Sequence, residues 1–471
     1  MDYHYTTAEL CRILAGQSYH IPQNRCFSDF AIDSRKIQPG GLFFSIVGEN
    51  TDGHLYIEQA CKNGAQGIIA CRDKLPPGGL SLEIPLILVA DPNRSLRDLA
   101  KDYRSRLASG FVLAITGSNG KTSSKEIAAD LCRFLHPKVN ATQGNYNNFI
   151  GVPITILSAS LDASWWIVEM GTNHFGEIQT LSEMVRPNLG MITNVGESHL
   201  EFLENMEGVA CEKSGIFAGM DSGTIVAIPS DLRHSDIVSE QAIQHGIRLV
   251  RYGFTSWKSE ISPDYSATLR ECSSEQACFE FLDQLFEVST GNSLLLRNLL
   301  GVLTLLYLHN EPPDLLCEAC RFLNFEVKGR MQFRQMPSYL LVDDTYNANP
   351  TSFNEVIQSL RSLYPQKRLL VVAGAMAELG KQSADLHFQL GASMPMLGVK
   401  YLFTFGNNDA TYYIEGWKTR NKESENTFHT IDLNKLVSTF NQVVKKDDIV
   451  LVKGSRSAHM EQFVDAVMSY E

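Results

Sequence analysis

Short apolar runs alternate with segments of helical periodicity along most of this chain. The run GFVLAIT predicts a buried strand. In the segment KTSSKEIAADLCRFL that follows, four apolar residues recur at helical spacing: Ile127, Leu131, Phe134 and Leu135. Similar strand-like runs occur at residues 164–171, 189–196 and 223–229. Because strands that alternate with helices form parallel sheets, we predict a sheet with helices on both faces.

The pattern changes at several places and divides the chain. The turn-rich stretch DKLPPGGLSLEIP ends a first unit of short mixed elements, and residues 257–290 favour an antiparallel insertion. NEPPD near residue 312 precedes a second alternating run, and a length of 471 residues suits about three domains. We therefore predict an α/β protein with a small mixed N-terminal domain (1–85), a central doubly wound parallel sheet with a phosphate loop (100–312) and a C-terminal Rossmann-like α/β domain (313–471).

The composition of the chain limits the classes of binding partner and the cellular compartment that we expect. The net charge is -12, whereas proteins that grip a nucleic-acid backbone usually carry a basic surplus, so we expect no nucleic-acid partner. The apolar stretch at residues 293–308 contains Arg297 and Asn298, which favours a buried helix over a membrane span. The N-terminus lacks the apolar run of a signal peptide, and ten cysteines lie scattered, mostly in apolar runs. Scattered cysteines of this kind are typical of reduced thiols in a cytoplasmic protein, which we therefore expect. Cys317 and Cys320 form one C-x-x-C, whose apolar spacing predicts an ordinary core helix.

The segment between the first of these strands and its helix has the composition of a phosphate-binding loop. Its glycines allow close approach of an anion to the backbone, and the helix dipole favours negative charge there. Lys121 is placed to reach the β and γ phosphates of a nucleotide, and Thr122 offers a hydroxyl to Mg²⁺. Ile115 stands where the usual loop has its first glycine. The predicted loop comprises Thr116, Gly117, Ser118, Asn119, Gly120, Lys121, Thr122 and Ser123.

Three further polar residues stand out after the loop. Glu169 ends a predicted strand, where its carboxylate can complete the Mg²⁺ site begun by Thr122. His199 follows the next strand, and Lys213 lies in an apolar helix, where a lysine needs a partner or a lowered pKa. Plainer alternatives are a surface histidine and a lysine whose stem lies flat with its ammonium in water.

The loop TGSNGKTS and these three residues resemble the Mur ligases, ATP-dependent amide-forming enzymes that build the peptidoglycan precursor. The resemblance implies that Glu169 holds one Mg²⁺, that His199 helps to hold a second, and that Lys213 carries a carbamate formed with CO₂. It also implies that the segments KGRMQF and DDTYNANPTSF close on ATP, with Arg330 near the phosphates and Asp344 near the ribose. The expected catalytic residues are Lys121, His199, Lys213 and Arg330, and the expected nucleotide contacts beyond the loop are Asn298, Arg330, Asp344 and Asn347.

Within the family, DDTYNANPTS, GNYNNFIGVP and MAELG are most similar to the branch that adds D-Ala-D-Ala to UDP-N-acetylmuramoyl-tripeptide through an acyl phosphate. Ser34 and Arg35 would then lie near the uridine diphosphate sugar. The full set of substrate residues that the resemblance implies is Ser34, Arg35, Asn145, Asn148, Lys453 and Arg456. We expect a monomer, and either lysine or diaminopimelate at the third peptide position is compatible with these residues.

The chain departs from the family pattern in three places. The stretch GNSLLLRNLL lacks the usual histidine, which leaves Asn298 as the residue expected at the adenine. Ala375 replaces the usual aspartate before MAELG, and the bulkier run 202–205 replaces glycines after HLE. Two alternatives therefore stay open: a paralogous Mur-type or folylpolyglutamate-type ligase with a different amine acceptor, and a nucleotide-binding module without ligase activity.

Overall fold

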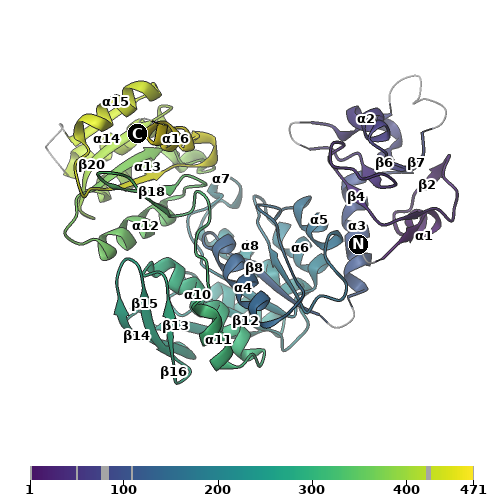
Figure 1. The fold of residues 1–471 in the computed structure, drawn as a ribbon, viewed down its shortest axis with the longest axis horizontal. Helices are drawn as coiled ribbons and strands as arrows, with labels where there is room; N and C mark the ends of the chain where they lie inside the picture. The colour runs from purple at the N-terminus through teal and green to yellow at the C-terminus, as the bar shows by residue number, and fades with distance from the viewer. Residues whose placement is uncertain (1–2, 49–50, 76–83, 108–109, 421–425, 470–471) are drawn as a thin grey trace.

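The computed structural model describes residues 3–48, 51–75, 84–107, 110–420 and 426–469, which form three α/β domains arranged in an arc (Figure 1). In this view the N-terminal and C-terminal domains stand at the two ends of the arc, above the central domain. Parallel strands dominate the large sheets, which confirms the predicted fold class. The predicted turn at residues 73–85 lies largely outside the described residues.

The N-terminal domain is built on a small sheet of mixed direction. Its strands are β2 (Gln17–Tyr19), β4 (Phe30–Ala31), β5 (Leu42–Phe44), β6 (Gly67–Cys71) and β7 (Leu86–Val89), beside the pair β1 (Tyr5–Thr6) and β3 (Cys26–Phe27). The sheet order is β2-β7-β6-β5-β4, with β2 antiparallel to β7 and the other pairs parallel. The helices are α1 (Thr7–Ile13), α2 (Ile57–Lys62) and α3 (Pro92–Ser105), the last of which runs into the central domain.

The central domain has a nine-stranded sheet in the order β16-β15-β14-β13-β12-β11-β8-β10-β9. Its strands are β8 (Phe111–Thr116), β9 (Val139–Ala141), β10 (Trp165–Glu169), β11 (Leu189–Ile192), β12 (Ile225–Pro229), β13 (Arg248–Phe254), β14 (Tyr265–Cys272), β15 (Ala277–Phe281) and β16 (Gln284–Val288). Its helices are α4 (Lys121–Leu135), α5 (Gly151–Leu157), α6 (Glu177–Val185), α7 (Leu200–Leu203), α8 (Met206–Ser214), α9 (Ser235–Gln244), α10 (Ser293–Leu308) and α11 (Pro313–Cys320). The strands from β9 to β14 are parallel, and β14 to β16 are antiparallel, as predicted for residues 257–290.

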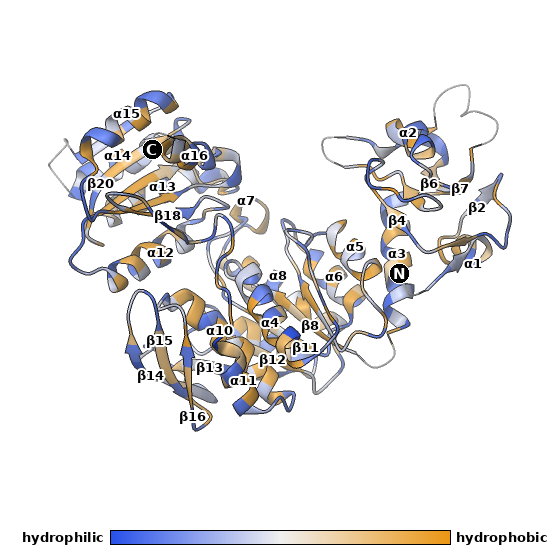
Figure 2. Cartoon of the chain, viewed as in Figure 1, coloured by the Kyte–Doolittle hydropathy of each residue, from blue (hydrophilic) through white to orange (hydrophobic). Residues whose placement is uncertain are grey.

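Alternate side chains of β8 serve the two faces of this sheet. Leu113 and Ile115 share a core with α4, α10 and α11, whereas Val112 and Ala114 belong to the core under α5, α6 and α8. Figure 2 shows the strands as mostly hydrophobic and the outer helix surfaces as mostly hydrophilic.

Helix α4 departs in one detail from its predicted apolar face. Ile127 and Leu131 are buried, but Phe134 is 43% exposed and stacks on Phe322 beside α11. Helix α11 contains both cysteines of the C-x-x-C pair, as predicted. Its Cys320 packs in the core of the central domain, although we predicted that the C-terminal domain begins at residue 313. The apolar stretch at 293–308 is α10, as predicted, and among the described residues no helix is long and apolar enough to cross a membrane.

The C-terminal domain repeats the strand-and-helix alternation around a six-stranded sheet. Its strands are β17 (Gln332–Gln335), β18 (Leu340–Asp344), β19 (Leu369–Gly374), β20 (Val399–Phe405), β21 (Thr427–Thr430) and β22 (Ile449–Lys453), in the order β17-β18-β22-β19-β20-β21. Its helices are α12 (Pro350–Leu363), α13 (Ser383–Ser393), α14 (Asp409–Arg420), α15 (Leu433–Val443) and α16 (Glu461–Ser469). All neighbouring strands except β17 and β18 are parallel, so the loops after β18, β19 and β22 lie at one edge of the sheet.

Candidate active site

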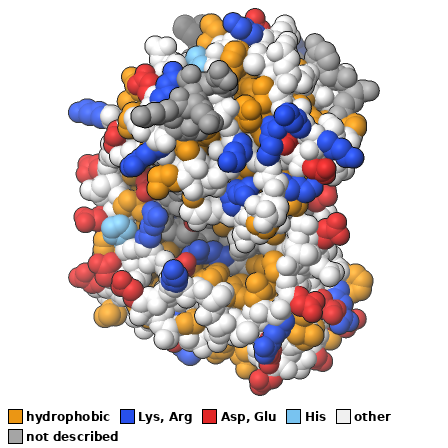
Figure 3. Space-filling model, turned by 90° about the vertical axis from the view of Figure 1, so that its left-hand side faces the viewer, with side chains coloured by type: hydrophobic (Ala, Val, Ile, Leu, Met, Phe, Trp, Pro, Cys, Tyr) orange, Lys and Arg blue, Asp and Glu red, His pale blue; other side chains and the backbone are white. Residues whose placement is uncertain are grey.

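A cavity of about 840 Å³ lies between the central and C-terminal domains. Figure 3 shows the molecule hollowed between these two domains, with Lys and Arg side chains at the hollow. In the central sheet β8 lies between β10 and β11, and open parallel sheets bind ligands where the strand order reverses in this way. The predicted residues that line the cavity are Ser118, Asn119, Gly120, Lys121, Ser123, Asn145, Glu169, His199, Asn298, Arg330, Asp344, Asn347, Lys453 and Arg456.

The predicted phosphate loop joins β8 to α4 and is held by the residues that follow β11. The backbone NH of Asn119 donates to Oδ1 of Asn194 over 2.8 Å, and Oγ1 of Thr193 donates to the carbonyl of Asn119 over 2.5 Å. Gly120 has a φ of 78°, and a Cβ there would stand 2.8 Å from Oδ1 of Asn298. The asparagine expected at the adenine therefore lies directly against the loop, where glycine leaves room for it.

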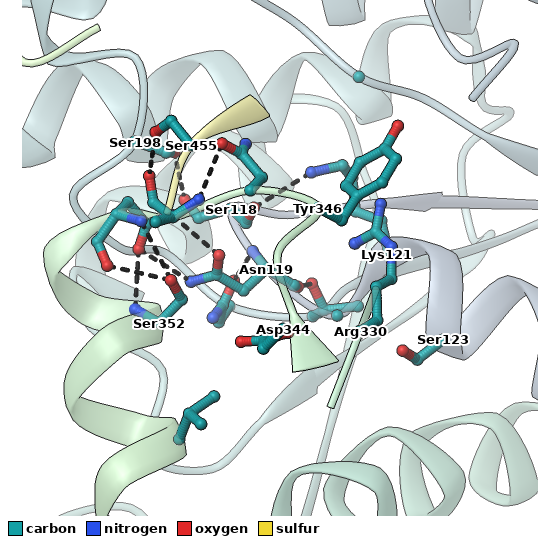
Figure 4. Close-up of a pocket in the computed structure, with 18 of the residues that line it drawn as sticks. Ser118, Asn119, Lys121, Ser123, Ser198, Arg330, Asp344, Tyr346, Ser352 and Ser455 are labelled. Carbon is teal, nitrogen blue, oxygen red and sulfur yellow. Dashed lines mark hydrogen bonds between the residues drawn. The ribbon is translucent and has the colours of Figure 1, made fainter. Parts of the chain in front are cut away.

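Lys121 is the main cation of this loop. Its ammonium donates to the carbonyls of Gly117 and Ser118 over 2.8 Å and 3.2 Å. Figure 4 draws Lys121 and Arg330 among the residues that line the cavity. Desolvation lowers its pKa to about 8; the carboxylate of Glu169 opposes this shift, and the charge of Arg330 adds to it. Charged hydrogen bonds to phosphate are stronger than those to neutral carbonyls, so a phosphate that enters the cavity can displace these two acceptors.

Two of the predicted metal residues are buried, and each has an atom without a hydrogen-bond partner among the described residues. Glu169 is 1% exposed; its Oε1 accepts from Nδ2 of Asn147 over 2.7 Å, while its Oε2 has no partner among the described residues. The amine of Lys213 is fully buried and likewise has no partner there. Burial, and next the charge of Lys121, lower the pKa of Lys213 to about 7. Buried polar atoms are normally satisfied, so these two fit a cation and a modified lysine.

The C-terminal domain contributes the opposite wall. The guanidinium of Arg330 lies 4.1 Å from the ring centre of Tyr346. Asp344 accepts from Nζ of Lys453 over 2.5 Å and from the backbone NH of Met331 over 3.0 Å. Lys453 is therefore paired with a carboxylate of its own domain. Arg456 also pairs with a carboxylate of this domain, because its Nη1 lies 3.4 Å from Oε1 of Glu461, but its side chain is 67% exposed.

The two domains meet at several residues that were not predicted as site residues. Nδ2 of Asn349 donates to Oδ1 of Asn119 over 2.8 Å, and Thr351 donates to the carboxylate of Glu197. Oε2 of Glu378 lies 2.5 Å from Nδ1 of His199. The loop MAELG was matched as a motif, but its sequence alone does not show which side chain faces the central domain. Asn147, Asn194 and Ser198 also line the cavity. Asn147 lies within the matched run GNYNNFIGVP but was not chosen, and the only signal for Asn194 and Ser198 was a position after a strand.

Several predicted residues lie elsewhere. Thr116, Gly117, Thr122 and Lys213 are not part of the cavity lining, and Thr122 is only 7% exposed. Asn148 accepts from the backbone NH of Gly151 over 2.9 Å at the start of α5, and its neighbour Asn147 lines the cavity instead.

The two predicted sugar-binding residues belong to the N-terminal domain. Ser34 is 6% exposed, whereas the Arg35 side chain is 83% exposed. Arg35 pairs with Asp33 over 2.9 Å and holds the pKa of that carboxyl at about 2.

Comparisons with known proteins cover nearly the whole chain. "Mur ligase family, catalytic domain" matches residues 29–104, "Mur ligase middle domain" matches 115–303, and "Mur ligase, glutamate ligase domain" matches 329–456. The UDP-N-acetylmuramoyl-tripeptide--D-alanyl-D-alanine ligase of Haemophilus influenzae is 30% identical over 445 residues, which cover 92% of each chain. The crystal structure of MurF from Acinetobacter baumannii has a TM-score of 0.87 at 26% identity, with 99% of each chain covered. The MurF ligase of Thermotoga maritima in complex with ADP has a TM-score of 0.78 at 28% identity, covering 93% of this chain and 96% of that one.

Proposed function

Because this chain belongs to the Mur ligase family, we propose that it adds D-alanyl-D-alanine to UDP-N-acetylmuramoyl-tripeptide in peptidoglycan precursor synthesis, with ATP cleaved to ADP. One observation carries the proposal. Lys121, Glu169, His199 and Arg330 come from two domains and line a single cavity. Two cations and a carboxylate around one cavity, with Lys121 at a helix N-terminus and Glu169 at the end of a parallel strand, suit a nucleoside triphosphate.

The chemistry follows from the charges in this cavity. The terminal carboxylate of the tripeptide attacks the γ-phosphorus of ATP, which yields an acyl phosphate and ADP. The neutral amine of D-Ala-D-Ala then attacks the acyl carbon, inorganic phosphate leaves, and the nitrogen loses one proton as the amide forms. Negative charge accumulates at the γ-phosphate in the first step, so Lys121 and Arg330 act by stabilising it. Closure of the C-terminal domain over the cavity keeps water away from the acyl phosphate.

Glu169, His199 and the hydroxyl of Thr122 would hold Mg²⁺, which supplies further positive charge at the phosphates when bound. The buried amine of Lys213, with its pKa near 7, can attack CO₂ as a neutral nucleophile and release a proton, which leaves an anionic carbamate. Lys213→Ala should then lose activity and regain part of it with a short-chain carboxylic acid. Unchanged activity in that variant would remove the carbamate from the mechanism.

The remaining residues divide between nucleotide and substrates. Asn298, Asp344 and Asn347 would contact the nucleoside. The substrate residues are Ser34 and Arg35 for the uridine diphosphate, Asn145 and Asn148 near the peptide acid, and Lys453 and Arg456 near the acceptor. In this scheme the N-terminal domain binds the sugar nucleotide, the central domain, including α11, holds ATP and the C-terminal domain brings the acceptor, in a cytoplasmic monomer.

Phosphate release tests the proposal directly. The purified protein is given ATP and UDP-N-acetylmuramoyl-tripeptide, with and without D-Ala-D-Ala, and with other amines in parallel. We expect sustained release only with the dipeptide. Sustained release with another amine instead would indicate a paralogous ligase, and ATP binding without release would indicate a nucleotide-binding module.

A further inference from the structure

Glu378 lines the cavity but has no role in the scheme above. It lies in the loop after β19, in the C-terminal domain, and its Oε2 is 2.5 Å from Nδ1 of His199 in the central domain. The His199 side chain is 15% exposed, so its ring has little freedom, whereas the Glu378 side chain is 39% exposed. A carboxylate from one domain thus meets an imidazole that lines the reaction site of another.

The backbone on both sides of this contact is fixed. The carbonyl of Glu378 accepts from the backbone NH of Glu201 over 3.0 Å, and a Cβ on Gly380 would stand 3.1 Å from the Cα of Glu201. His199 and Glu378 have φ values of 55° and 60°, a left-handed conformation that surroundings must impose on residues with side chains. The meeting of the two side chains therefore follows from how the α7 segment and the Glu378 loop dock.

We infer that Glu378 is a positioning residue that orients His199 for metal binding. The negative charge of the carboxylate, 2.5 Å from Nδ1, favours a proton on that nitrogen, which leaves the lone pair of Nε2 available to a divalent cation. This inference rests on the proposed function, in which His199 helps to hold Mg²⁺. The donor set suits a cation, because the buried Oε2 of Glu169 lacks a partner among the described residues.

Glu378 and His199 lie on different domains, so their contact depends on domain docking. Because Glu378 belongs to the C-terminal domain, the imidazole is oriented only while that domain is docked on the central domain. The metal site is then complete only in the closed enzyme, so phosphoryl transfer is disfavoured while the cavity is open to water.

Binding of Mn²⁺, followed by electron paramagnetic resonance, tests the inference without turnover. The full-length protein is loaded with ADP and given no peptide substrate. Glu378→Gln keeps the size of the side chain and the cost of the positive φ at this position, but it removes the negative charge. We expect Mn²⁺ to bind about 10–100-fold more weakly to this variant and kcat to fall by a similar factor. Gln382→Ala is the matched control, because Gln382 bonds the carbonyl of Glu204 over 3.4 Å at the same interface. Its Mn²⁺ affinity should stay within about twofold of the wild type.

A double-mutant cycle separates positioning from simple attachment of the domains. If Glu378 acts through His199, Glu378→Gln should cause no further loss of Mn²⁺ affinity in a His199→Ala background. An equal further loss there would overturn the inference, and so would wild-type Mn²⁺ affinity in the single variant. Absence of Mn²⁺ binding by the wild-type ADP complex would instead count against the metal site of the proposed function.

Discussion

Nδ2 of Asn349 donates a hydrogen bond of 2.8 Å to Oδ1 of Asn119, so the first turn of α12 touches the phosphate loop of another domain. The same side chain caps its own helix, because Oδ1 of Asn349 accepts from the backbone NH of Ser352 over 2.8 Å. One asparagine therefore links the start of a helix to closure of the domains.

Replacing Asn349 with serine separates these two roles. Serine still caps the helix but is too short to reach Asn119. Loss of the 2.8 Å hydrogen bond and of the longer one of 3.4 Å that Asn119 donates in return, together about 0.5–1.5 kcal/mol, should raise the KM for ATP by about 2–10-fold without changing the unfolding temperature. Steady-state kinetics and thermal circular dichroism measure the two effects. Asn349→Ala is the comparison, because it should also destabilise the protein by about 1 kcal/mol. A serine variant with the wild-type KM would show that the contact does not contribute to closure on ATP.

Lys121→Ala should abolish turnover while the fold stays intact. The substitution removes the cation expected at the γ-phosphate, and loss of one such group typically lowers kcat by at least about 10²-fold. Phosphate release gives the rate, and near-ultraviolet circular dichroism checks the fold. Turnover at the wild-type rate would remove the phosphate-loop assignment.

Lys213 should make stability depend on pH. Its pKa is lowered to about 7 in the folded protein, so between about pH 7 and pH 10 the unfolded chain binds more protons at this site than the folded chain. The free energy of unfolding should therefore rise with pH in this window because of Lys213, by at most about 1.4 kcal/mol per pH unit. Below pH 7 the lysine is protonated in both states and its cost to the folded state is complete.

Lys213→Met removes this titration. Urea unfolding in CO₂-free buffer should show the methionine variant more stable than the wild type at pH 7, with a difference that shrinks as pH approaches 10. Lys121 titrates in both proteins, but loss of the positive charge of Lys213 also favours the charged form of Lys121, which adds to the stability of the variant near pH 7. A difference that stays constant with pH would contradict the lowered pKa.

Gly117→Ala should destabilise the phosphate loop. Gly117 has a φ of 143°, and a Cβ there would stand 2.0 Å from Oγ1 of Thr193, which is itself bonded to the loop. We expect a loss of at least about 1–3 kcal/mol in urea unfolding. Gly144 is the control, because it also has a positive φ, of 53°, but a Cβ there has no neighbour within 4 Å. Equal losses in the two variants would mean that the collision with Thr193 is relieved at little cost.

The sequence allowed the positions of residues to be predicted where hydrophobic periodicity defines the strand or helix next to them. The strand that ends at Thr116 and the helix that begins at Lys121 follow from hydrophobic periodicity, so the loop between them and the strand-end Glu169 could be placed at one edge of a sheet. The same rule failed for Phe134, because the helical period cannot show where the covering helix ends and solvent begins.

Contacts between domains could not be predicted in this way. Asn119 and Asn349 are 230 positions apart, and their contact depends on how two separately folded units dock. Periodicity also says nothing inside a loop, and the family resemblance pointed to Asn145 and Asn148 but not to Asn147, which donates to Glu169.

The two carbonyls that hold the Lys121 ammonium bear on how the enzyme is reset after each cycle. When ADP departs, the ammonium can again donate to the carbonyl oxygens of Gly117 and Ser118, so it is not left without a hydrogen-bond acceptor in the cavity. Product departure therefore exchanges one set of oxygens for another, and the loop can release its nucleotide without first drawing bulk water into the cavity.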